Sequence, residues 1–386
     1  MAAWIFYLLV LFLPTQLGYH FWPDWAFNKG LRVDYLSPTF HFTDLLVLGM
    51  LVAGRFPRIT LSNKLLLLMV FVIINIATSV SWQVSAFKWL KIVEMGYLAL
   101  WLKENFRYLD KGKVYTCFFA GLITEVLLVF AQILHQGSLG GIFYWLGERA
   151  INAVTIGAAR AATVFGLVYR PYGTFSHPNV LAGYLVIVSA ILFYVYRRGR
   201  QILMLFTPLV IMALIPAVSR SAILALVLAV SAELIFLLRK KSFALREYFL
   251  PMGLFWIGLV IVMLAMVFGA DVNMAFFSRW DQVKFVFSQP LIRYFFGWGL
   301  GSSAIIGYSV GGQPIHNLPL LLLLETGLVG LSAIVYNFKK FFVEKRWVGL
   351  RIIYFVLAMF DHYLLTSQQG LLLSAVIFGI TFLRKE

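Results

Sequence analysis

The sequence predicts an all-α, polytopic integral membrane protein with about twelve transmembrane helices. Of its 386 residues, 61% are hydrophobic and only 12% are charged, about half the charged fraction of an ordinary soluble domain. Apolar runs of about 20 residues recur along the chain, and this is the length that a helix needs to cross a bilayer. The short alternating segments of a transmembrane barrel do not recur. We therefore expect residues 1–386 to form a single membrane domain.

Each apolar run is interpreted as one membrane helix, in chain order. The first, MAAWIFYLLVLFLPTQLGYHF, has no basic residues before its apolar part, which favours a membrane helix over a cleavable signal peptide. The second is short and requires tilting or local thinning of the bilayer. The fourth carries Lys88 and Lys91, which indicates that part of it lies in the interface. The predicted helices cover residues 3–21, 42–54, 62–80, 84–102, 114–134, 178–196, 202–217, 220–238, 248–269, 316–337, 347–365 and 368–383.

Two sets of loops alternate between these helices and differ in charge. One set is short and basic and reads GRFPR, KENFRYLDKGK, RRGR, RKKSFALRE, KKFFVEKR and RKE. By the positive-inside rule this set is cytoplasmic, and both termini lie in the cytoplasm. The other set is long, aromatic and lightly charged, and we expect it outside the cytoplasmic (inner) membrane, with short interfacial helices in its two longest members. These outer loops are residues 22–41, 135–177 and 270–315, the last between the ninth and tenth helices.

The net charge of +16 is explained by this topology. The basic residues form no continuous stripe with interleaved aromatic residues, which argues against nucleic acid as a partner and leaves membrane lipids. The chain also contains no D-x-D pair, no H-E-x-x-H, no C-x-x-C and no P-loop. The sequence therefore predicts neither a metal site nor another cofactor.

Four residues that carry or can carry positive charge fall in outer loops or at outer helix ends: Arg170, Arg220, Arg279 and His316. The positive-inside tendency disfavours cations there, so their position needs another reason. Arg220 is predicted to begin a helix, where free backbone N–H groups and the helix dipole favour an anion. A guanidinium also binds phosphate oxygens through two parallel hydrogen bonds. The pattern predicts an extracytoplasmic site for a lipid-linked phosphate.

Each of these residues also has a structural explanation, and the sequence leaves both open. Arg170 could extend to the lipid headgroups, and Arg279 could pair with Asp281. The dipeptide Asp361-His362, at the outer end of the eleventh helix, is interpreted as a structural capping pair. Besides Arg170, four polar residues are expected to bind the substrate at this anion site: Asn179, His177, Ser219 and Asn317.

The stretch RPYGTFSHPNVLAGY, residues 170–184, places two prolines and two glycines at the start of the sixth helix. Irregular backbone at membrane depth is tolerated where protein or water satisfies its polar groups. We therefore expect this stretch to line a wet cavity, with Gly173 and Gly183 allowing the backbone to approach lipid or sugar closely.

Four segments in this order resemble the O-antigen ligase and polymerase superfamily of bacterial membrane glycosyltransferases. They read RPYGTFSHPNVLAGYL, SRSAILAL, FGWGLGSS and HNLPLLLLLETGLVGL, and weaker likeness extends over most of the chain. The resemblance implies a fold of about twelve helices with a large outer loop before the histidine. It also implies a substrate glycan carried on undecaprenyl pyrophosphate and transferred outside the cytoplasmic membrane without metal or ATP.

The resemblance implies residue roles as well. Family members use outward arginines for the pyrophosphate and a histidine as general base, and by motif these roles fall to Arg220, Arg279 and His316. Arg170 and Asn179 would support the same cavity. In this scheme an acceptor hydroxyl on a glycan, lipid or protein attacks the anomeric carbon while His316 accepts its proton. The arginines would neutralise the departing lipid pyrophosphate.

Two alternatives to a ligase remain at this level. The four segments do not separate a ligase from a polymerase that joins repeat units. A transporter or flippase of lipid-linked glycan would carry ionisable groups near the bilayer midplane, and Glu125, Glu233 and Glu325 do lie within or near predicted helices. The gathering of Arg and His at the outer helix ends favours the transferase.

Overall fold

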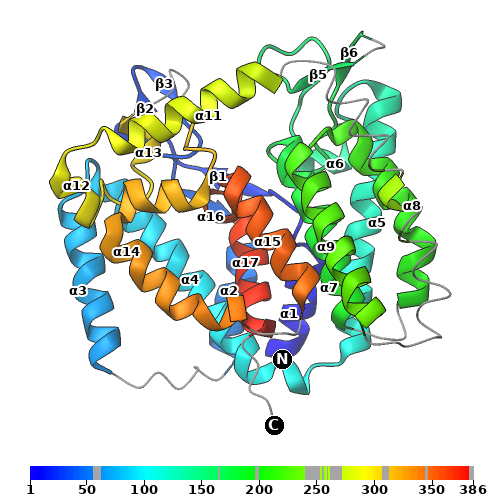
Figure 1. Cartoon of the computed structure of the whole chain (residues 1–386), viewed down its shortest axis with the longest axis horizontal. Coiled ribbons are helices and arrows are strands. Elements are labelled where there is room, and N and C mark those ends of the chain that lie inside the picture. Colours follow the sequence, from blue (N-terminus) through cyan, green and yellow to red (C-terminus); the bar gives the residue numbers. More distant parts are fainter. Residues whose placement is uncertain are drawn as a thin grey trace.

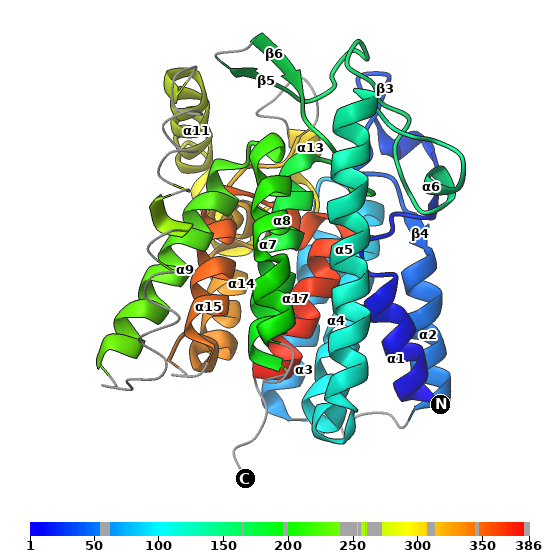
Figure 2. The ribbon, with the colours of Figure 1, turned by 90° about the vertical axis from the view of Figure 1, so that its right-hand side faces the viewer.

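The computed structural model describes residues 1–54, 62–163, 166–195, 200–239, 253, 256–258, 260, 272–306, 313–343 and 347–381. The described chain is mostly helical, and its longer helices run roughly side by side (Figures 1 and 2). They are α1 (Ala2–Leu11), α2 (Phe42–Ala53), α3 (Asn63–Ala77), α4 (Trp82–Asn105), α5 (Lys111–His135), α7 (Pro178–Val195), α8 (Arg200–Ala217), α9 (Arg220–Arg239), α14 (Leu318–Val343), α15 (Val348–Phe360) and α17 (Gln368–Thr381).

Several of these helices begin where a polar side chain caps free backbone N–H groups. Ser62 accepts a hydrogen bond from the Leu65 N–H at the start of α3, and Ser81 accepts one from Val84 at the start of α4. The carboxylate of Asp110 accepts two backbone N–H groups at the start of α5. Such caps satisfy donors that have no partner within the helix, so they fix where each apolar run becomes helical.

Three helices are long and apolar enough to cross a membrane: Lys111–His135, Pro178–Val195 and Leu318–Asn337. Several further apolar helices among the described residues are shorter, at 10–17 residues. A mostly helical chain with helices of this kind is in keeping with the predicted membrane protein.

Two predicted helices are too long at one end, and one lies outside the described residues. The first was expected over residues 3–21 but ends at Leu11, because Pro14 follows within a turn and residues 18–20 pair as a strand instead. The eleventh was expected to reach residue 365, but α15 ends at Phe360 because Asp361 is extended. The ninth, residues 248–269, falls mostly on residues that the structure does not describe.

Small elements gather at one end of the bundle, opposite the N- and C-termini (Figure 2). Three two-stranded antiparallel sheets lie in this part of the chain, which the sequence did not predict. The short helices expected in the long loops are present. The strands are β1 (Gly18–His20) with β4 (Thr39–His41), β2 (Phe27–Asn28) with β3 (Leu31–Arg32), and β5 (Arg160–Thr163) with β6 (Gly166–Tyr169), and the short helices at this end are η1 (Asp24–Ala26), α6 (Ile142–Trp145), α11 (Val272–Phe287), α12 (Leu291–Phe296), α13 (Ser303–Ile306) and α16 (Tyr363–Thr366). The short helix η2 (Phe106–Tyr108) joins α4 to α5 at the opposite end.

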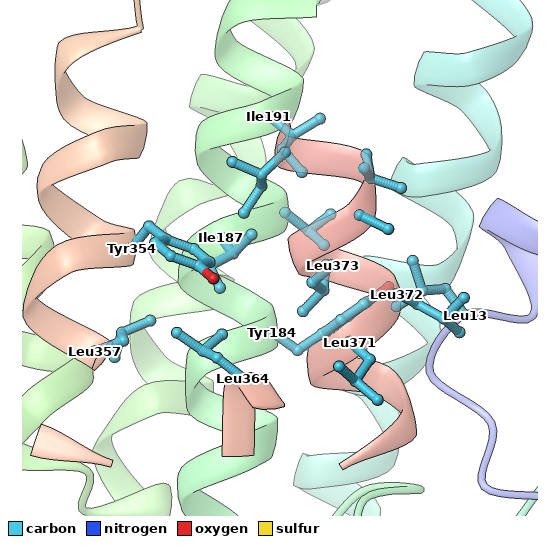
Figure 3. Close-up of a cluster of buried hydrophobic side chains, with 14 of the residues drawn as sticks. Leu13, Tyr184, Ile187, Ile191, Tyr354, Leu357, Leu364, Leu371, Leu372 and Leu373 are labelled. Carbon is cyan, nitrogen blue, oxygen red and sulfur yellow. The ribbon is translucent and has the colours of Figure 1, made fainter. Parts of the chain in front are cut away.

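The core is centred on α7, whose residues are buried along nearly its whole length. Tyr184, Ile187 and Ile191 of α7 face side chains from α15, α16 and α17 in one apolar cluster (Figure 3). Helix α7 also packs against α5, α8 and α9. Because α7 is enclosed by its neighbours, the residues at its N-terminal end are held in a fixed position relative to several other helices.

Candidate functional site

Asp361 is the centre of a polar cluster at the end of the bundle where α15 stops. Its carboxylate is buried and makes contacts with three parts of the chain. Oδ1 accepts the His362 backbone N–H at 2.8 Å and lies 3.6 Å from Nδ1 of His316, while Oδ2 accepts Nδ2 of Asn179 at 3.2 Å. We call Asp361, His362, His316, Asn179 and Arg170 the Asp361 cluster.

His316 lies in the segment that leads into α14. Its backbone N–H donates to Oε1 of Gln282 on α11 at 2.9 Å, which ties the segment to that helix. The next residue, Asn317, accepts the Leu320 N–H at the start of α14 and donates to the Met359 carbonyl at 2.7 Å. These bonds orient the His316 imidazole toward Asp361. The His316 side chain is 34% exposed, so a bound molecule could reach it.

Arg170 braces two helix ends against each other. Its Nε and one terminal nitrogen donate to the Ala217 carbonyl at 2.9 and 2.7 Å, and the same terminal nitrogen donates to Oδ1 of Asn179 at 2.7 Å. Burial lowers the pKa of Arg170 to about 10, with the charge of Arg220 adding to the effect, so the guanidinium stays protonated at neutral pH. Arg170 therefore acts from within the protein and holds the α8–α9 turn beside Asn179.

Arg220 is the first residue of α9, directly after that turn. Val218 in the turn has a φ of +46°, a left-handed conformation that is strained for a β-branched residue. Ser219 is buried, and its hydroxyl lies 3.4 Å from that of Ser221. Arg220 is partly exposed at the helix N-terminus, where backbone N–H groups and the helix dipole favour an anion.

Arg279 reaches the same region from α11. A terminal nitrogen donates to the Phe360 carbonyl at 3.3 Å, and the guanidinium lies 5.3 Å from the centre of the Phe360 ring. Partial desolvation lowers the pKa of Arg279. The negative charge of Asp361 acts to raise this pKa, and the positive charge of Arg220 acts to lower it further. Arg279 therefore contacts the residue directly before Asp361 in the chain. Its side chain is held by Phe360 and not by the pairing with Asp281 that the sequence left open.

His177 lies just before α7. Its Nδ1 accepts the backbone N–H of Asn179 at 3.1 Å, and its ring meets the ring of Tyr172 edge-on at 6.2 Å. The imidazole thus caps the first turn of α7 and helps to orient Asn179 toward Asp361.

The stretch of residues 170–184 is held by buried carboxylate and amide groups of α5 and by Glu148. Glu125 accepts both the backbone N–H and the hydroxyl of Thr174, at 3.1 and 2.6 Å. Gln132 accepts the N–H groups of Tyr172 and Gly173 and donates to Glu148. Through these bonds Glu125 holds the loop of residues 170–184 against α5.

The two glycines of this stretch make room for protein groups, and the expectation that they admit lipid or sugar is wrong. Gly173 has a φ of +58°, and a β-carbon there would collide with the carboxylate of Glu125. A β-carbon on Gly183 would collide with the hydroxyl of Tyr363. Close packing of loop against helix is therefore what requires glycine at both positions.

The motif FGWGLGSS forms a loop around the side chains of Asn75 and Glu325. Glu325 accepts the N–H groups of Gly301 and Ser303 at 2.9 and 3.1 Å. Asn75 accepts the Leu300 N–H and donates to two backbone carbonyls. The glutamate that lies within a predicted membrane helix is thus engaged in holding this loop.

Three side chains of the Asp361 cluster could also ligate a metal ion. One ligand atom from each of His316, Asp361 and His362 lies within 4.8 Å of the others, among the described residues. Two of these groups are already engaged: Nδ1 of His362 lies 2.6 Å from the Thr366 hydroxyl, and both oxygens of Asp361 accept hydrogen bonds. The positive charges of Arg170, Arg220 and Arg279 further favour an anion over a dication at this position.

The structure brings the predicted site residues to one end of the bundle. A continuous path of contacts joins Arg170, Asn179, Asp361 and His316, and Arg220, Arg279, His177, Ser219 and Asn317 adjoin it. Sequence reasoning missed the central role of Asp361 and His362, which were interpreted as a capping pair. Comparisons with protein-family models, curated proteins and solved structures find no match to this chain.

Proposed function

We propose that this chain is a metal-independent membrane glycosyltransferase of the O-antigen ligase type. It moves an oligo- or polysaccharide from undecaprenyl pyrophosphate to an acceptor hydroxyl at the extracytoplasmic face of the cytoplasmic membrane. The observation that carries the proposal is the convergence of Arg170, Arg220, Arg279 and His316, from four separate parts of the chain, around the single carboxylate of Asp361. The four sequence segments that resemble the ligase and polymerase superfamily support the same function.

The proposed reaction is a displacement at the anomeric carbon of the lipid-linked sugar. The acceptor oxygen forms a bond to this carbon while the bond to the pyrophosphate oxygen breaks and carries its electron pair to the leaving group. His316 accepts the acceptor's proton through Nε2. Asp361 faces Nδ1, which favours the tautomer with hydrogen on Nδ1 and stabilises the imidazolium that forms.

Arg220 and Arg279 are proposed to bind the pyrophosphate, whose negative charge grows as the sugar leaves. A donor aimed at developing charge is worth about 3–4 kcal/mol of transition-state stabilisation. Arg220 has the additional support of the α9 N-terminus. Arg170 and Asn179 position these groups and do not themselves react, because the hydrogen bonds of Arg170 are directed at the protein.

The proposed topology has about twelve membrane helices and both termini in the cytoplasm. Three helices of sufficient length, the further apolar helices, and the position of both termini at the end opposite the Asp361 cluster support it. The described basic segment of residues 103–113 joins α4 to α5 at the terminal end, and the positive-inside rule gives it a cytoplasmic position. A cluster at the other end would then face the outer leaflet, where lipid-linked glycans are used.

Deletion of the gene, followed by analysis of surface glycans, tests this proposal. A ligase predicts long chains stranded on the carrier lipid, whereas a polymerase of the same superfamily predicts short unpolymerised units. Normal surface glycans with no accumulation of lipid-linked material would contradict both. Accumulation on the cytoplasmic leaflet alone would indicate a flippase instead.

A further inference from the structure

The segment between α1 and α2, residues 18–41, supplies a side chain to the Asp361 cluster that no sequence motif marked. The ring of Tyr35 meets the ring of His362 edge-on, with 5.5 Å between centroids. The charge of Asp361 is close enough to act on the Tyr35 phenol. Tyr35 therefore borders the cluster that contains His316, although it comes from the opposite end of the sequence.

This segment is folded firmly for so short a piece of chain. Strand β1 pairs with β4, and Nδ1 of His20 lies 2.9 Å from the Thr39 hydroxyl. Ala26, Val33 and Leu36 form a small buried core with residues of α4 and α13. Asn28 donates to the Ala304 carbonyl at 3.1 Å, which fixes the β2–β3 turn to α13 (Figure 1). Tyr35 is thus presented by a rigid support.

A salt bridge joins the segment to the loop of residues 135–177. Nη2 of Arg149 lies 2.6 Å from Oδ2 of Asp34, the residue before Tyr35. Both side chains are more than a third exposed, so the pair contributes little to overall stability. Its consequence is geometric: two outer loops, one carrying Tyr35 and the other carrying Arg170 and His177, are held next to each other at the cluster.

The Tyr35 hydroxyl is available to a bound molecule. Among the described residues it has no hydrogen-bond partner, while both oxygens of the nearby Asp361 carboxylate already accept hydrogen bonds. Burial, and then the charge of Asp361, raise the pKa of Tyr35 to about 12, so the phenol stays protonated at physiological pH. A neutral phenol can donate one hydrogen bond and accept another, which suits a sugar hydroxyl.

Two tryptophan rings lie on the same small core as Tyr35. Trp22 and Trp25 pack on the same small core as Tyr35, and all three are partly exposed. The Trp22 ring is stacked on His20 at 5.6 Å and carries the Arg32 guanidinium at 5.3 Å, so its orientation is fixed before any ligand arrives. Rings with an apolar face and a polar edge bind ligands that combine both characters, as pyranose rings do.

We propose that residues 18–41 form the subsite for the acceptor sugar and that the Tyr35 hydroxyl hydrogen-bonds this sugar beside His316. The inference rests on the proposed transferase function and assigns the acceptor side of the same site. Arg220 and Arg279 remain the groups for the lipid pyrophosphate, so the two substrates meet at the Asp361 cluster from different elements. Tyr35 positions the attacking hydroxyl and exchanges no proton in the reaction.

The substitution Tyr35→Phe tests this assignment, because it removes one hydroxyl that has no hydrogen-bond partner within the described part of the chain. The donor is lipid-linked glycan purified from the deletion strain, and the acceptor is supplied by membranes of that strain. We expect the KM for the acceptor to rise about tenfold, the effect of one lost hydrogen bond in a desolvated site. The KM for the donor and the binding of undecaprenyl diphosphate should stay at wild-type values. Tyr19→Phe, on the same segment but 68% exposed, is the matched control.

The possible results distinguish failure of the acceptor subsite from failure of the proposed function. An acceptor KM within twofold of wild type for Tyr35→Phe would overturn the subsite while leaving the transferase intact. A rise in the donor KM alone would also overturn it, because Tyr35 would then serve the lipid side. Absence of transfer by the wild-type protein with these substrates would overturn the proposed function, and the subsite with it.

Discussion

Two clusters of charged side chains lie within the same helical bundle, and they differ in charge balance and in exposure. Around Asp361, a single carboxylate is surrounded by three arginines and two histidines. In the second, which we call the Asp44 cluster, Lys91 of α4 forms ion pairs with Asp44 of α2 and with Glu94 of α4. Three guanidinium groups thus lie near the one carboxylate of Asp361, whereas in the Asp44 cluster two carboxylates share one ammonium group, with His41 also beside Asp44.

The two clusters also differ in the exposure of their side chains. The His316 side chain is 34% exposed, whereas those of Lys91 and Asp44 are 9% and 3% exposed. Gln368 of α17 also donates to Asp44, so the second cluster joins three helices internally. A buried charge that is paired within the protein holds helices together, and several positive charges gathered around one carboxylate, next to a partly exposed side chain, favour an anion. The presence of ionisable residues in membrane helices therefore does not by itself indicate a binding site. The balance of charges and the exposure of the side chains to a ligand distinguish a binding site from a cluster that only holds helices together.

The comparison predicts its largest effect at His316. The substitution His316→Ala should lower transfer by at least a hundredfold, because a general base contributes a factor of about 10²–10⁴. Protein yield in the membrane should be unchanged, since the imidazole is partly exposed. Transfer is measured with purified donor and acceptor membranes, and His135→Ala at the exposed end of α5 serves as control. Wild-type product yield from His316→Ala would refute its role as base.

A change in the Asp44 cluster should affect stability and not chemistry. Lys91→Met leaves Asp44 and Glu94 without their ammonium partner, and breaking a buried pair costs about 3–5 kcal/mol. We expect a lower temperature of thermal inactivation in detergent, with the rate of transfer per folded molecule close to wild type. Lys103→Met, on the exposed part of the same helix, should change neither quantity. A large loss of turnover without loss of stability would mean that the Asp44 cluster belongs to the site.

The smallest expected effect is that of metal removal. Three side chains of the Asp361 cluster could ligate a metal, but the surrounding arginines favour an anion. Dialysis against a strong chelator should therefore leave the rate of transfer within experimental error of the untreated protein. Loss of activity on chelation, restored by one divalent ion, would show that these side chains hold a metal after all.

Apolar length was enough to locate most helices but not their polar ends. The first predicted helix ran through Pro14 because the hydrophobic composition continues past it, whereas the backbone leaves the helix before that proline. The hairpins of residues 18–41 and 160–169 were missed, since such short strands give no periodic signal among aromatic loops.

The candidate site was predicted from positively charged residues at positions where the positive-inside rule disfavours them. Its central residue, Asp361, was not predicted. Arg220, Arg279 and His316 attract attention because cations are disfavoured in outer loops. Asp361 at a helix end looks like a cap, and only the fold brings Asn179 and His316 to its carboxylate. Tyr35 is an ordinary loop tyrosine until the packing of the segment against α13 and His362 is known. Residues that act through contacts distant in sequence leave no local pattern.

Binding of undecaprenyl diphosphate to the protein in nanodiscs tests the central claim most directly. Arg220→Lys keeps a positive charge but replaces a planar fork with a point charge, so we expect its Kd to rise at least tenfold over wild type. Lys91→Met, which removes a positive charge from the Asp44 cluster, should bind with the wild-type Kd. Equal binding by wild type and Arg220→Lys, or weaker binding by Lys91→Met alone, would contradict the assignment of the Asp361 end of the bundle as the anion site.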